Sequence, residues 1–283
     1  MLTYVKPVLH CSRVLFSNPM FTPSEFKVNP LKALLSTTDQ FGGIHTTPES
    51  LPSSPVEFRK QLCQSLEYWS TEGFKLVWLH IGIAKSNLIP IAVESGFSFH
   101  HTGNNHLMLV RPIVKGAFIP PYASHYIGAG GVVVNHKDEL LVVQEKREKP
   151  DTHNFYKLPG GTIHSGEHIV KGVIREVLEE TGISTSFDAL VCLRNIHGYR
   201  HDKSDIYFVC RLKPQTHKIS MQPEEIEECL WMPLDQYFNS TSVSTFNKSI
   251  VQTSLENPGF TPTIIEGYRD PEQVEIFLPS DFV

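Results

Sequence analysis

The sequence predicts an α/β protein built from two domains. Three observations lead to this prediction: the chain has 283 residues, helix and strand patterns alternate along it, and a Pro-Pro pair at 120–121 interrupts those patterns. A composition that is 40% hydrophobic and 19% charged is typical of a globular protein with a sizeable core. We therefore expect one domain on each side of the proline pair.

Residues 1–53 are predicted to be an N-terminal extension and linker. The stretch ends in TTPESLPSSP, where proline, serine and threonine cluster before the first clear helix pattern. No acid precedes Glu25, and Lys6 and Arg13 are present, which faintly resembles a mitochondrial presequence. An ordinary disordered N-terminus is the simpler interpretation, because two basic residues are few and Pro7 interrupts a helix.

The first domain is predicted over residues 54–118. Apolar residues from Phe58 to Trp69 recur at spacings of four, four and three, which indicates an amphipathic helix. The remaining patterns, in order, are a strand in KLVWLHI, a helix in AKSNLIPIAVESG, and a hairpin of FSFHHTG and HLMLVRP. This order is that of a small α/β unit.

The second domain is predicted over residues 122–258. Strand patterns occur in five stretches: YIGAGGVVVN, ELLVVQEK, NFYKLPGG, FDALVCLRNIHG and DIYFVCRL. The stretch EEIEECLWMPLDQY is interpreted as an acidic loop that leads into a turn and a helix, and TFNKSIVQTSL as a last helix. Residues 259–283 show little periodicity and are predicted to form a C-terminal tail.

Composition excludes several classes of function. The net charge of −5 provides no basic surface for general nucleic-acid binding, although a small nucleotide could be held by a local site. The five cysteines are widely spaced without a C-x-x-C pair, as expected for neither a disulfide framework nor a thiolate zinc site. No apolar run approaches the roughly 20 residues of a membrane span, and no secretory signal is evident. We expect an intracellular protein without a membrane partner, cytoplasmic or nuclear, with the mitochondrion as the alternative.

The segment 160–183 crowds acids onto one predicted helix. At 100° per residue, Glu176, Glu179 and Glu180 fall within an arc of roughly 100°, beside an apolar stripe that can dock on a sheet. Like charges at these spacings repel each other, and one arginine, Arg175, cannot neutralise three carboxylates. A hard divalent cation such as Mg²⁺ is the natural counter-charge, and it accepts phosphate oxygens at its other positions. The alternative is a solvated acidic face.

A longer spacing decides between these alternatives. Residues 161–183 match G-x5-E-x7-R-E-U-x-E-E-x-G-U, the Nudix box, at every position. At an average usage of about 5 to 7% for each fixed residue type, a chance match is on the order of one in a billion per start position. The chain thus resembles a Nudix hydrolase, and this resemblance implies an α/β/α sandwich around a mixed sheet.

The resemblance extends upstream of the box and covers about residues 55–235. The stretches from SLEYWSTEGF to SGFSFHHT, LMLVRPI and YASHYIGAGG are similar to the pre-Nudix segment of the animal antisense basic fibroblast growth factor Nudix proteins and their plant relatives, which act on ADP-ribose and NADH. For the first domain this implies a half acetyltransferase-like fold. Its role would be to shape the substrate pocket or to form a homodimer interface.

The resemblance also implies roles for residues of the box. The carbonyl of Gly161 and the carboxylates of Glu176, Glu179 and Glu180 would bind Mg²⁺ or Mn²⁺, and Glu176 is also a candidate general base. Arg175 would orient these glutamates.

Four further residues are candidates by the same resemblance. Glu167 would assist through water or brace Arg175, or else serve as a favourable charge near a helix N-terminus. Glu225, in QPEEIEECLW, best fits the extra acid that such enzymes recruit from a loop, with a solvated loop as the alternative. Tyr156 and Tyr199 are candidates for substrate binding, and core packing is the alternative for Tyr156.

The expected function is that of a metal-dependent hydrolase. It would cleave the pyrophosphate of a nucleoside diphosphate linked to another moiety, by attack of water at phosphorus, and the relatives favour ADP-ribose or NADH as the substrate. The alternative is a Nudix-fold nucleotide-binding or regulatory protein with little turnover. Cleavage of an mRNA cap is a third hypothesis, which the charge of the chain does not favour.

Overall fold

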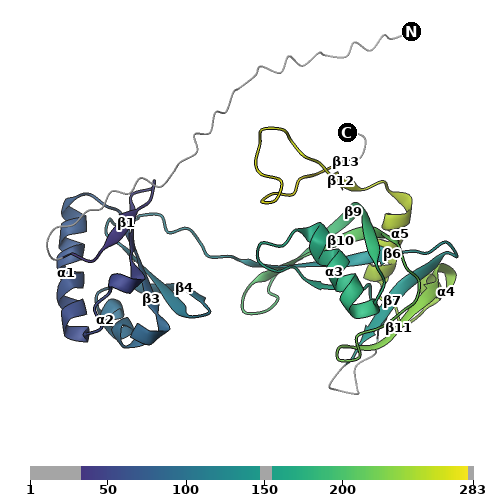
Figure 1. The fold of residues 1–283 in the computed structure, drawn as a ribbon, viewed down its shortest axis with the longest axis horizontal. Helices are drawn as coiled ribbons and strands as arrows, with labels where there is room; N and C mark the ends of the chain where they lie inside the picture. Colours follow the sequence, from purple (N-terminus) through teal and green to yellow (C-terminus); the bar gives the residue numbers. More distant parts are fainter. Residues whose placement is uncertain (1–32, 147–154, 280–283) are drawn as a thin grey trace, which may run out of the picture. The chain divides into compact units, whose positions relative to one another are not determined.

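The computed structural model describes residues 33–146 and 155–279 (Figure 1). The chain divides into two units, residues 1–122 and 123–283, each with its own hydrophobic core. Lys6 and Arg13, on which the presequence hypothesis depends, lie outside the described residues.

The first unit has a five-stranded sheet in the order β1-β2-β3-β5-β4. The β2–β3 pair is parallel and the other pairs are antiparallel. Its strands are β1 (Ser36–Thr38), β2 (Gly43–Thr46), β3 (Leu76–Gly82), β4 (Ser98–Gly103) and β5 (His106–Pro112). Its helices are η1 (Pro48–Ser50), α1 (Pro55–Thr71), η2 (Ile83–Leu88) and α2 (Ile89–Glu94).

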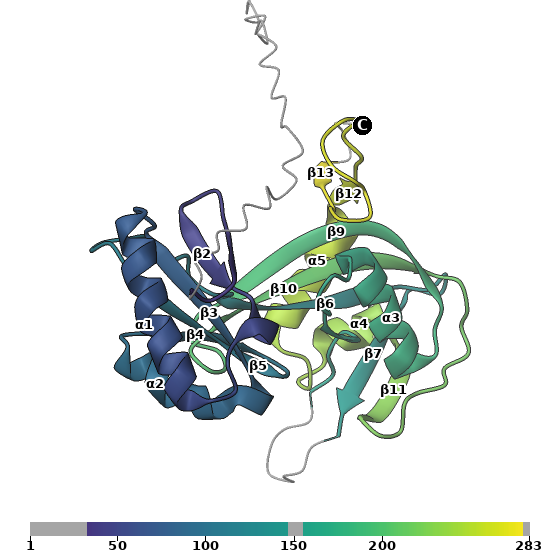
Figure 2. The ribbon, with the colours of Figure 1, turned by 60° about the vertical axis from the view of Figure 1, so that its left-hand side comes forward.

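Helix α1 covers one face of this sheet (Figure 2). The helix begins where Ser54 caps it by accepting a hydrogen bond from the backbone N–H of Glu57, and Pro55 occupies the first turn, where its missing donor costs nothing. Phe58 and Leu62, on the predicted apolar stripe, are completely buried against alternate residues of β3. The helix–strand–helix–hairpin order agrees with the sequence pattern.

The linker predicted up to residue 53 is wrong for its second half. Strands β1 and β2 form a hairpin that joins the sheet beside β3, and Leu34 and Ile44 lie in the same core as α1. The Asp39 side chain closes the turn by accepting hydrogen bonds from the N–H groups of Phe41 and Gly43, both 2.8 Å long. Strands of three and four residues are too short to give a period-two signal, so the composition of the following linker dominated the prediction.

The second unit is the predicted α/β/α sandwich with a mixed sheet. Its main sheet has the order β13-β12-β9-β10-β6-β8, in which β10 and β6 are parallel, and β11 and β7 form a separate antiparallel pair. The strands are β6 (His125–Val133), β7 (Glu139–Glu145), β8 (Gly160–Thr162), β9 (Thr185–Ile196), β10 (Ser204–Pro214), β11 (Ile226–Pro233), β12 (Phe260–Pro262) and β13 (Phe277–Pro279). The helices are α3 (Ile169–Thr181), α4 (Leu234–Asn239) and α5 (Thr245–Glu256).

Two hydrophobic cores lie on opposite sides of these strands. Val173 and Val177 of α3 pack with Ala129 and Val133 of β6. The neighbouring residue of β6, Val132, faces the other core, which includes side chains of α4 and α5. Alternation along β6 therefore places α3 on one face and α4 and α5 on the other.

Two other sequence interpretations are corrected in this unit. The stretch from 226 to 233, interpreted as an acidic loop, is strand β11, which pairs with β7. Glu227 and Glu228 are both exposed, and a register shift between Ile226 and Glu228 interrupts the alternation, so the sequence showed no strand pattern here.

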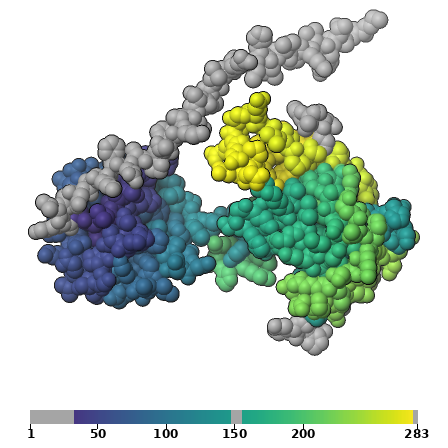
Figure 3. All heavy atoms as spheres, viewed as in Figure 1, coloured from purple at the N-terminus to yellow at the C-terminus, as the bar shows by residue number. Residues whose placement is uncertain are grey.

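The predicted C-terminal tail is also structured up to residue 279. Strands β12 and β13 pair with each other, and β12 contacts the sheet where Phe260 pairs with Leu190 of β9. The C-terminal residues, yellow in Figure 3, lie against the rest of the second unit. Each strand has three residues, and their stability depends on contacts with distant parts of the chain, which local periodicity does not report. Among the residues that the structure describes, no helix is long and apolar enough to cross a membrane.

Candidate active site

Helix α3 presents the acidic residues of the box. It begins after His168 and ends at Gly182, which adopts a left-handed conformation with φ of 70°. A Cβ atom at Gly182 would lie 2.8 Å from the backbone oxygen of Ser220, so both conformation and space require glycine. Because Val173 and Val177 face the core, the edge that carries the glutamates lies beside β8.

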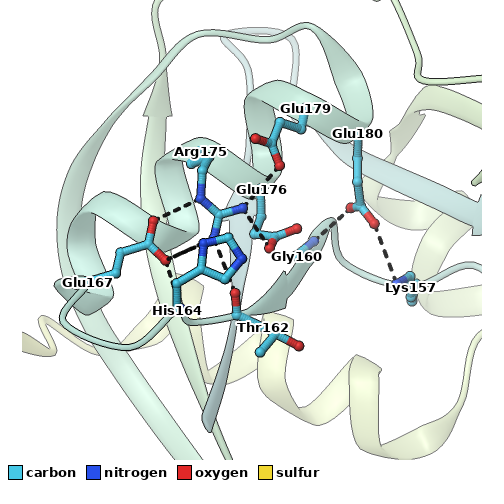
Figure 4. A network of polar contacts seen from close by, with 9 residues as sticks. All are labelled: Lys157, Gly160, Thr162, His164, Glu167, Arg175, Glu176, Glu179 and Glu180. Atoms are coloured by element: carbon cyan, nitrogen blue, oxygen red, sulfur yellow. Dashed lines mark hydrogen bonds and ion pairs between the residues drawn. The ribbon is translucent and has the colours of Figure 1, made fainter. Parts of the chain in front are cut away.

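Arg175 is the centre of the polar network on this edge (Figure 4). Its Nε and one terminal nitrogen donate to the two carboxylate oxygens of Glu167, at 2.8 and 2.9 Å. The other terminal nitrogen donates to Glu176 at 2.9 Å and to Glu179 at 3.0 Å. The remaining N–H reaches the Thr162 carbonyl at 3.1 Å, so each of the five guanidinium donors has an acceptor.

The two-pronged contact with Arg175 lowers the pKa of Glu167 to about 2, although burial opposes this shift. Glu167 also accepts a hydrogen bond from the backbone N–H of His164 at 2.9 Å. In turn, the pKa of Arg175 is raised, chiefly by its hydrogen bonds to Glu167. Glu167 is therefore ionised at neutral pH, and of the roles considered for it, the geometry supports bracing of Arg175.

Glu176 lies against the glycine that opens the box. A Cβ atom at Gly161 would be 2.5 Å from a carboxylate oxygen of Glu176, so a side chain at 161 would displace this carboxylate. Only 15% of the Glu176 side chain is exposed, whereas 53% of the Glu179 side chain is. Gly161 and Glu176 are thus in contact, and Glu179 extends toward solvent.

Glu180 occupies a buried place at the end of β8. It accepts a hydrogen bond from the backbone N–H of Gly160 at 2.8 Å, and the Nζ atom of Lys157 lies 3.7 Å away. Burial raises the pKa of Glu180 to about 7, against the effect of Lys157 and the Gly160 N–H, and nearby Glu145 and Glu176 raise it further. Lys157 also forms an ion pair with Glu145, the last residue of β7.

The donor set fits a hard divalent cation by its chemistry. Glu145, Glu176, Glu179 and Glu180 offer carboxylate oxygens and Gly161 a carbonyl oxygen, as magnesium and manganese prefer. Burial is the main cause of the raised pKa of Glu180, and nearby Glu145 and Glu176 add to it; a bound cation would favour the ionised carboxylate. Within the described ranges, however, no three acidic, histidine or cysteine side chains already converge as a metal cluster, because Arg175 holds Glu176 and Glu179 while Glu180 turns to Gly160.

A cavity of about 580 Å³ adjoins this edge. Gly161 and Thr162 of β8 and Glu145 of β7 lie in its wall next to the acidic residues. Strands β6, β9 and β10 and the loop of residues 197–203 contribute the rest of the wall. This volume is in the usual range for pockets that hold a small ligand.

Aromatic and basic side chains gather in or beside the part of the wall that β6, β9 and the loop of residues 197–203 form. The rings of Tyr126 and Tyr199 lie 6.3 Å apart between centroids, at nearly right angles. The guanidinium of Arg200 lies 5.1 Å from the centre of the Tyr199 ring, and Lys203 lies 5.6 Å from that of Tyr126. Arg194 forms an ion pair with Asp205 at 2.6 Å. One end of the cavity is therefore acidic, and another is aromatic and basic.

The structure brings together most of the residues that the sequence singled out. Gly161 and Tyr199 line the cavity, and Arg175 joins Glu167, Glu176 and Glu179 next to it.

Tyr156 and Glu225 are not among the cavity residues that the structure describes. The Tyr156 hydroxyl donates a hydrogen bond to Glu228 at 2.7 Å, and this bond raises the pKa of Tyr156 to about 12. Glu225 is exposed in the loop before β11, and its backbone carbonyl accepts a hydrogen bond from Lys146.

Sequence reasoning missed Glu145, Lys157 and Arg194. Glu145 lies in the cavity wall near the acids of the box, and it pairs in register with Ile226, the residue after Glu225. The loop that carries Glu225 thus lies next to the acid that the structure places at the site. Recognition of β11 as a strand that pairs with β7 would have identified Glu145.

Family models match both units. A model described as "NUDIX domain" matches residues 124–253, and one described as "Nudix hydrolase domain" matches residues 34–113. The second match begins before β1, in agreement with the assignment of β1 and β2 to the first unit.

Curated proteins give the same result. Nudix hydrolase 8 of Arabidopsis thaliana is 40% identical over 70% of this chain, which spans 54% of that protein, about half of its length. Nudix hydrolase 2 of Arabidopsis thaliana is 38% identical over 81% of this chain and 85% of that protein. The human protein named nucleoside diphosphate-linked moiety X motif 6 is 33% identical over 77% of this chain and 70% of its own length.

These matches identify an enzyme that hydrolyses nucleoside diphosphates linked to another moiety. The chain belongs to the Nudix hydrolase family. Members of this family generally use divalent metals.

Proposed function

We propose that this hydrolase uses Mg²⁺ or Mn²⁺ to cleave the pyrophosphate of ADP-ribose or NADH by attack of water at phosphorus. The observation that carries the proposal is that the oxygen donors and the cavity adjoin each other. Gly161 is one of the donors and also lines the cavity, and so does Glu145, which pairs with Lys157. A pyrophosphate at the acidic end would leave the rest of a nucleotide within the aromatic and basic end.

The cation would be held by Glu176, Glu179, Glu180 and the Gly161 carbonyl, with Glu145 as the additional acid in place of Glu225. When bound, it would neutralise charge on the phosphate oxygens and lower the pKa of a coordinated water. Among these residues, Glu176 lies nearest to Gly161 and is the candidate general base. Arg175 keeps the carboxylates of Glu176 and Glu179 on the same edge of α3.

The choice of ADP-ribose or NADH is supported by the cavity wall and by the resemblance of the first unit to enzymes that act on these compounds. Tyr126 and Tyr199 offer aromatic faces for a base or a nicotinamide ring, and stacking on an aromatic side chain is tolerant of base identity. Arg200 and Lys203 supply positive charge for phosphate or ribose oxygens.

The first test is hydrolysis of ADP-ribose, NADH, NAD, dinucleoside polyphosphates and capped RNA, with Mg²⁺ and then with Mn²⁺. Release of AMP is measured for the adenine compounds, and release of the guanosine nucleotide for capped RNA. The wild-type chain should turn over ADP-ribose or NADH, and Glu179→Gln should reduce kcat by about 100-fold or more, because a ligand loses its charge. Glu224→Gln, the same change at an exposed acid, is the matched control and should leave kcat unchanged.

The alternative is a nucleotide-binding or regulatory protein with little turnover. Absence of turnover for every compound, together with ligand binding that survives Glu179→Gln, would favour that alternative. Turnover of capped RNA alone would support the enzyme and contradict the proposed substrates.

A further inference from the structure

The N-terminus of helix α3 is capped by a residue more than 100 positions away in the sequence. The first N–H groups of any helix lack partners within the helix. Here the N-cap residue is His168, and within the described part of the chain its side chain makes no capping hydrogen bond. Instead, the carboxylate of Glu275 accepts hydrogen bonds from the N–H groups of Ile169, at 2.6 Å, and Val170, at 3.2 Å.

This contact is well suited to a carboxylate. The Glu275 side chain is only 14% exposed, and its charge faces the positive end of the helix dipole, with His168 Nδ1 at 3.8 Å. A carboxylate that accepts two backbone hydrogen bonds in a shielded place holds those groups firmly, since a neutral or shorter side chain would leave at least one donor without a partner.

The segment that carries Glu275 is itself anchored. Its carbonyl at Glu272 accepts a hydrogen bond from His168 Nε2 at 3.1 Å, and the exposed Glu272 carboxylate lies 3.3 Å from Lys171. Two residues after Glu275, Phe277 packs against Phe187 in the α3 core, with the ring centres 6.0 Å apart. The view in Figure 3 shows this C-terminal segment, in yellow, packed on the second unit.

The capped N-terminus of α3 is close in sequence to the hydrogen-bond network around Arg175. Glu167, which holds Arg175, is two residues before Ile169, and Arg175 in turn holds Glu176 and Glu179. A shift of the α3 N-terminus would therefore move both the helix and the brace that aligns its acids. Gly182 already fixes the other end of α3.

We propose that Glu275 is a positioning residue for the hydrolase reaction, which acts by fixing the N-terminus of α3 and thereby the acidic residues of the box. The C-terminal segment then belongs to the architecture of the active site, although Glu275 itself does not contact the cavity residues described above. The inference depends on the proposed role of the α3 glutamates in binding a divalent cation.

The test compares Glu275→Ala, Glu275→Gln and the control Glu272→Ala in the full-length chain. Glu272 is a carboxylate of the same segment, but its side chain is 79% exposed and contacts Lys171 rather than the helix N–H groups. The measurements are kcat and KM for the turned-over substrate, hydrogen exchange at Ile169 and Val170, affinity for Mn²⁺, and the thermal midpoint.

Glu275→Ala should lower kcat by about 10- to 100-fold with KM within about twofold, since it displaces acids rather than removing substrate contacts. Exchange at Ile169 and Val170 should accelerate. Glu275→Gln, which keeps an acceptor oxygen and the length, should recover part of kcat, and Glu272→Ala should match the wild type.

Wild-type kcat in Glu275→Ala, or an equal loss in Glu272→Ala, would overturn the proposal. If Glu275→Ala does not fold, Glu275→Gln decides: a lower kcat at an unchanged thermal midpoint supports the proposal, and wild-type kcat refutes it. If the wild type itself lacks turnover, the hydrolase assignment fails separately, and Mn²⁺ affinity decides. About tenfold weaker Mn²⁺ binding in Glu275→Ala then supports positioning, whereas unchanged binding contradicts it.

Discussion

At the scale of single residues, the site has more acidic than basic side chains. Arg175 and Lys157 contact five glutamates, namely Glu145, Glu167, Glu176, Glu179 and Glu180. Glu167 takes two of the five donors of Arg175, which keeps the guanidinium in one orientation. The other acids share the remaining donors, and burial raises the pKa of Glu180. The excess of acid over base is a property of the site that a single cation would correct.

The first prediction concerns Glu167 and acid stability. Its pKa is about 2 in the folded chain against an ordinary value of 4.5, so the Glu167–Arg175 pair stabilises the fold fully above pH 4.5. That contribution, on the order of 1–3 kcal/mol, is lost as the pH falls toward 2, because the unfolded chain binds the proton first. Glu167→Gln should remove this part of the pH dependence. Urea unfolding between pH 7 and pH 3 checks this. The prediction is contradicted if the free energy of unfolding falls equally with pH in the wild type and in Glu167→Gln.

At the scale of elements, one arginine ends helix α5. Arg211 of β10 donates to the carbonyl oxygens of Ser254 at 2.6 Å, Asn257 at 2.7 Å and Pro258 at 2.8 Å, and it also pairs with Asp188. It therefore joins the sheet to the end of the helix and to the start of the C-terminal segment.

The second prediction follows from this contact. Arg211→Met should reduce the free energy of unfolding by about 2–3 kcal/mol, because several carbonyl groups and one carboxylate lose a charged donor. Lys213→Met is the matched control: Lys213 pairs with the same Asp188, but its side chain is 69% exposed, and its loss should cost less than about 1 kcal/mol. Equal losses in the two variants, measured by urea unfolding, would show that the carbonyl contacts contribute nothing.

The elements also show which parts of the structure the sequence could predict. Helix α1 and the box helix have long periodic patterns and clear ends at Ser54 and Gly182, so their positions followed from the sequence. Strands β1, β2, β12 and β13 have three or four residues and are defined by pairing with distant segments, so no local pattern predicted them.

The same difference applies to the site. Residues of the box follow from a fixed spacing along one helix, because a helix converts spacing into direction. Glu145 and Arg194 reach the cavity through strand pairing, and Glu275 reaches α3 through the path of the C-terminal segment. Spacing along the sequence carries no information about such contacts.

At the scale of the whole molecule, the cavity is built by the second unit, from strands β6 to β10 and the loop at 197–203. This loop brings the ring of Tyr199 to 6.3 Å from that of Tyr126, measured between centroids. Under the proposed function, nucleotide binding and chemistry at phosphorus would take place in different parts of this cavity.

A third prediction distinguishes nucleotide binding from chemistry at phosphorus. Tyr199→Ala should raise KM by roughly 5- to 150-fold, the equivalent of about 1–3 kcal/mol of stacking, with a smaller change in kcat. Tyr268→Ala, at an exposed tyrosine of the C-terminal segment, is the control and should leave both constants unchanged. Steady-state kinetics with ADP-ribose and NADH checks this, and a loss confined to kcat would refute the binding role of Tyr199.

The fixed ends of α3 also limit how this chain can vary. Between Ile169, held by Glu275, and the left-handed Gly182, the helix has 13 residues. One inserted or deleted residue would change its length by about 1.5 Å and rotate every following side chain by about 100°. Glu176, Glu179 and Glu180 would then face the core or solvent, while Val173 and Val177 could no longer pack together. The length of this helix is therefore as strictly determined as its acids. Substitutions at its outer face, which change neither its length nor its packing, leave the geometry of the site intact.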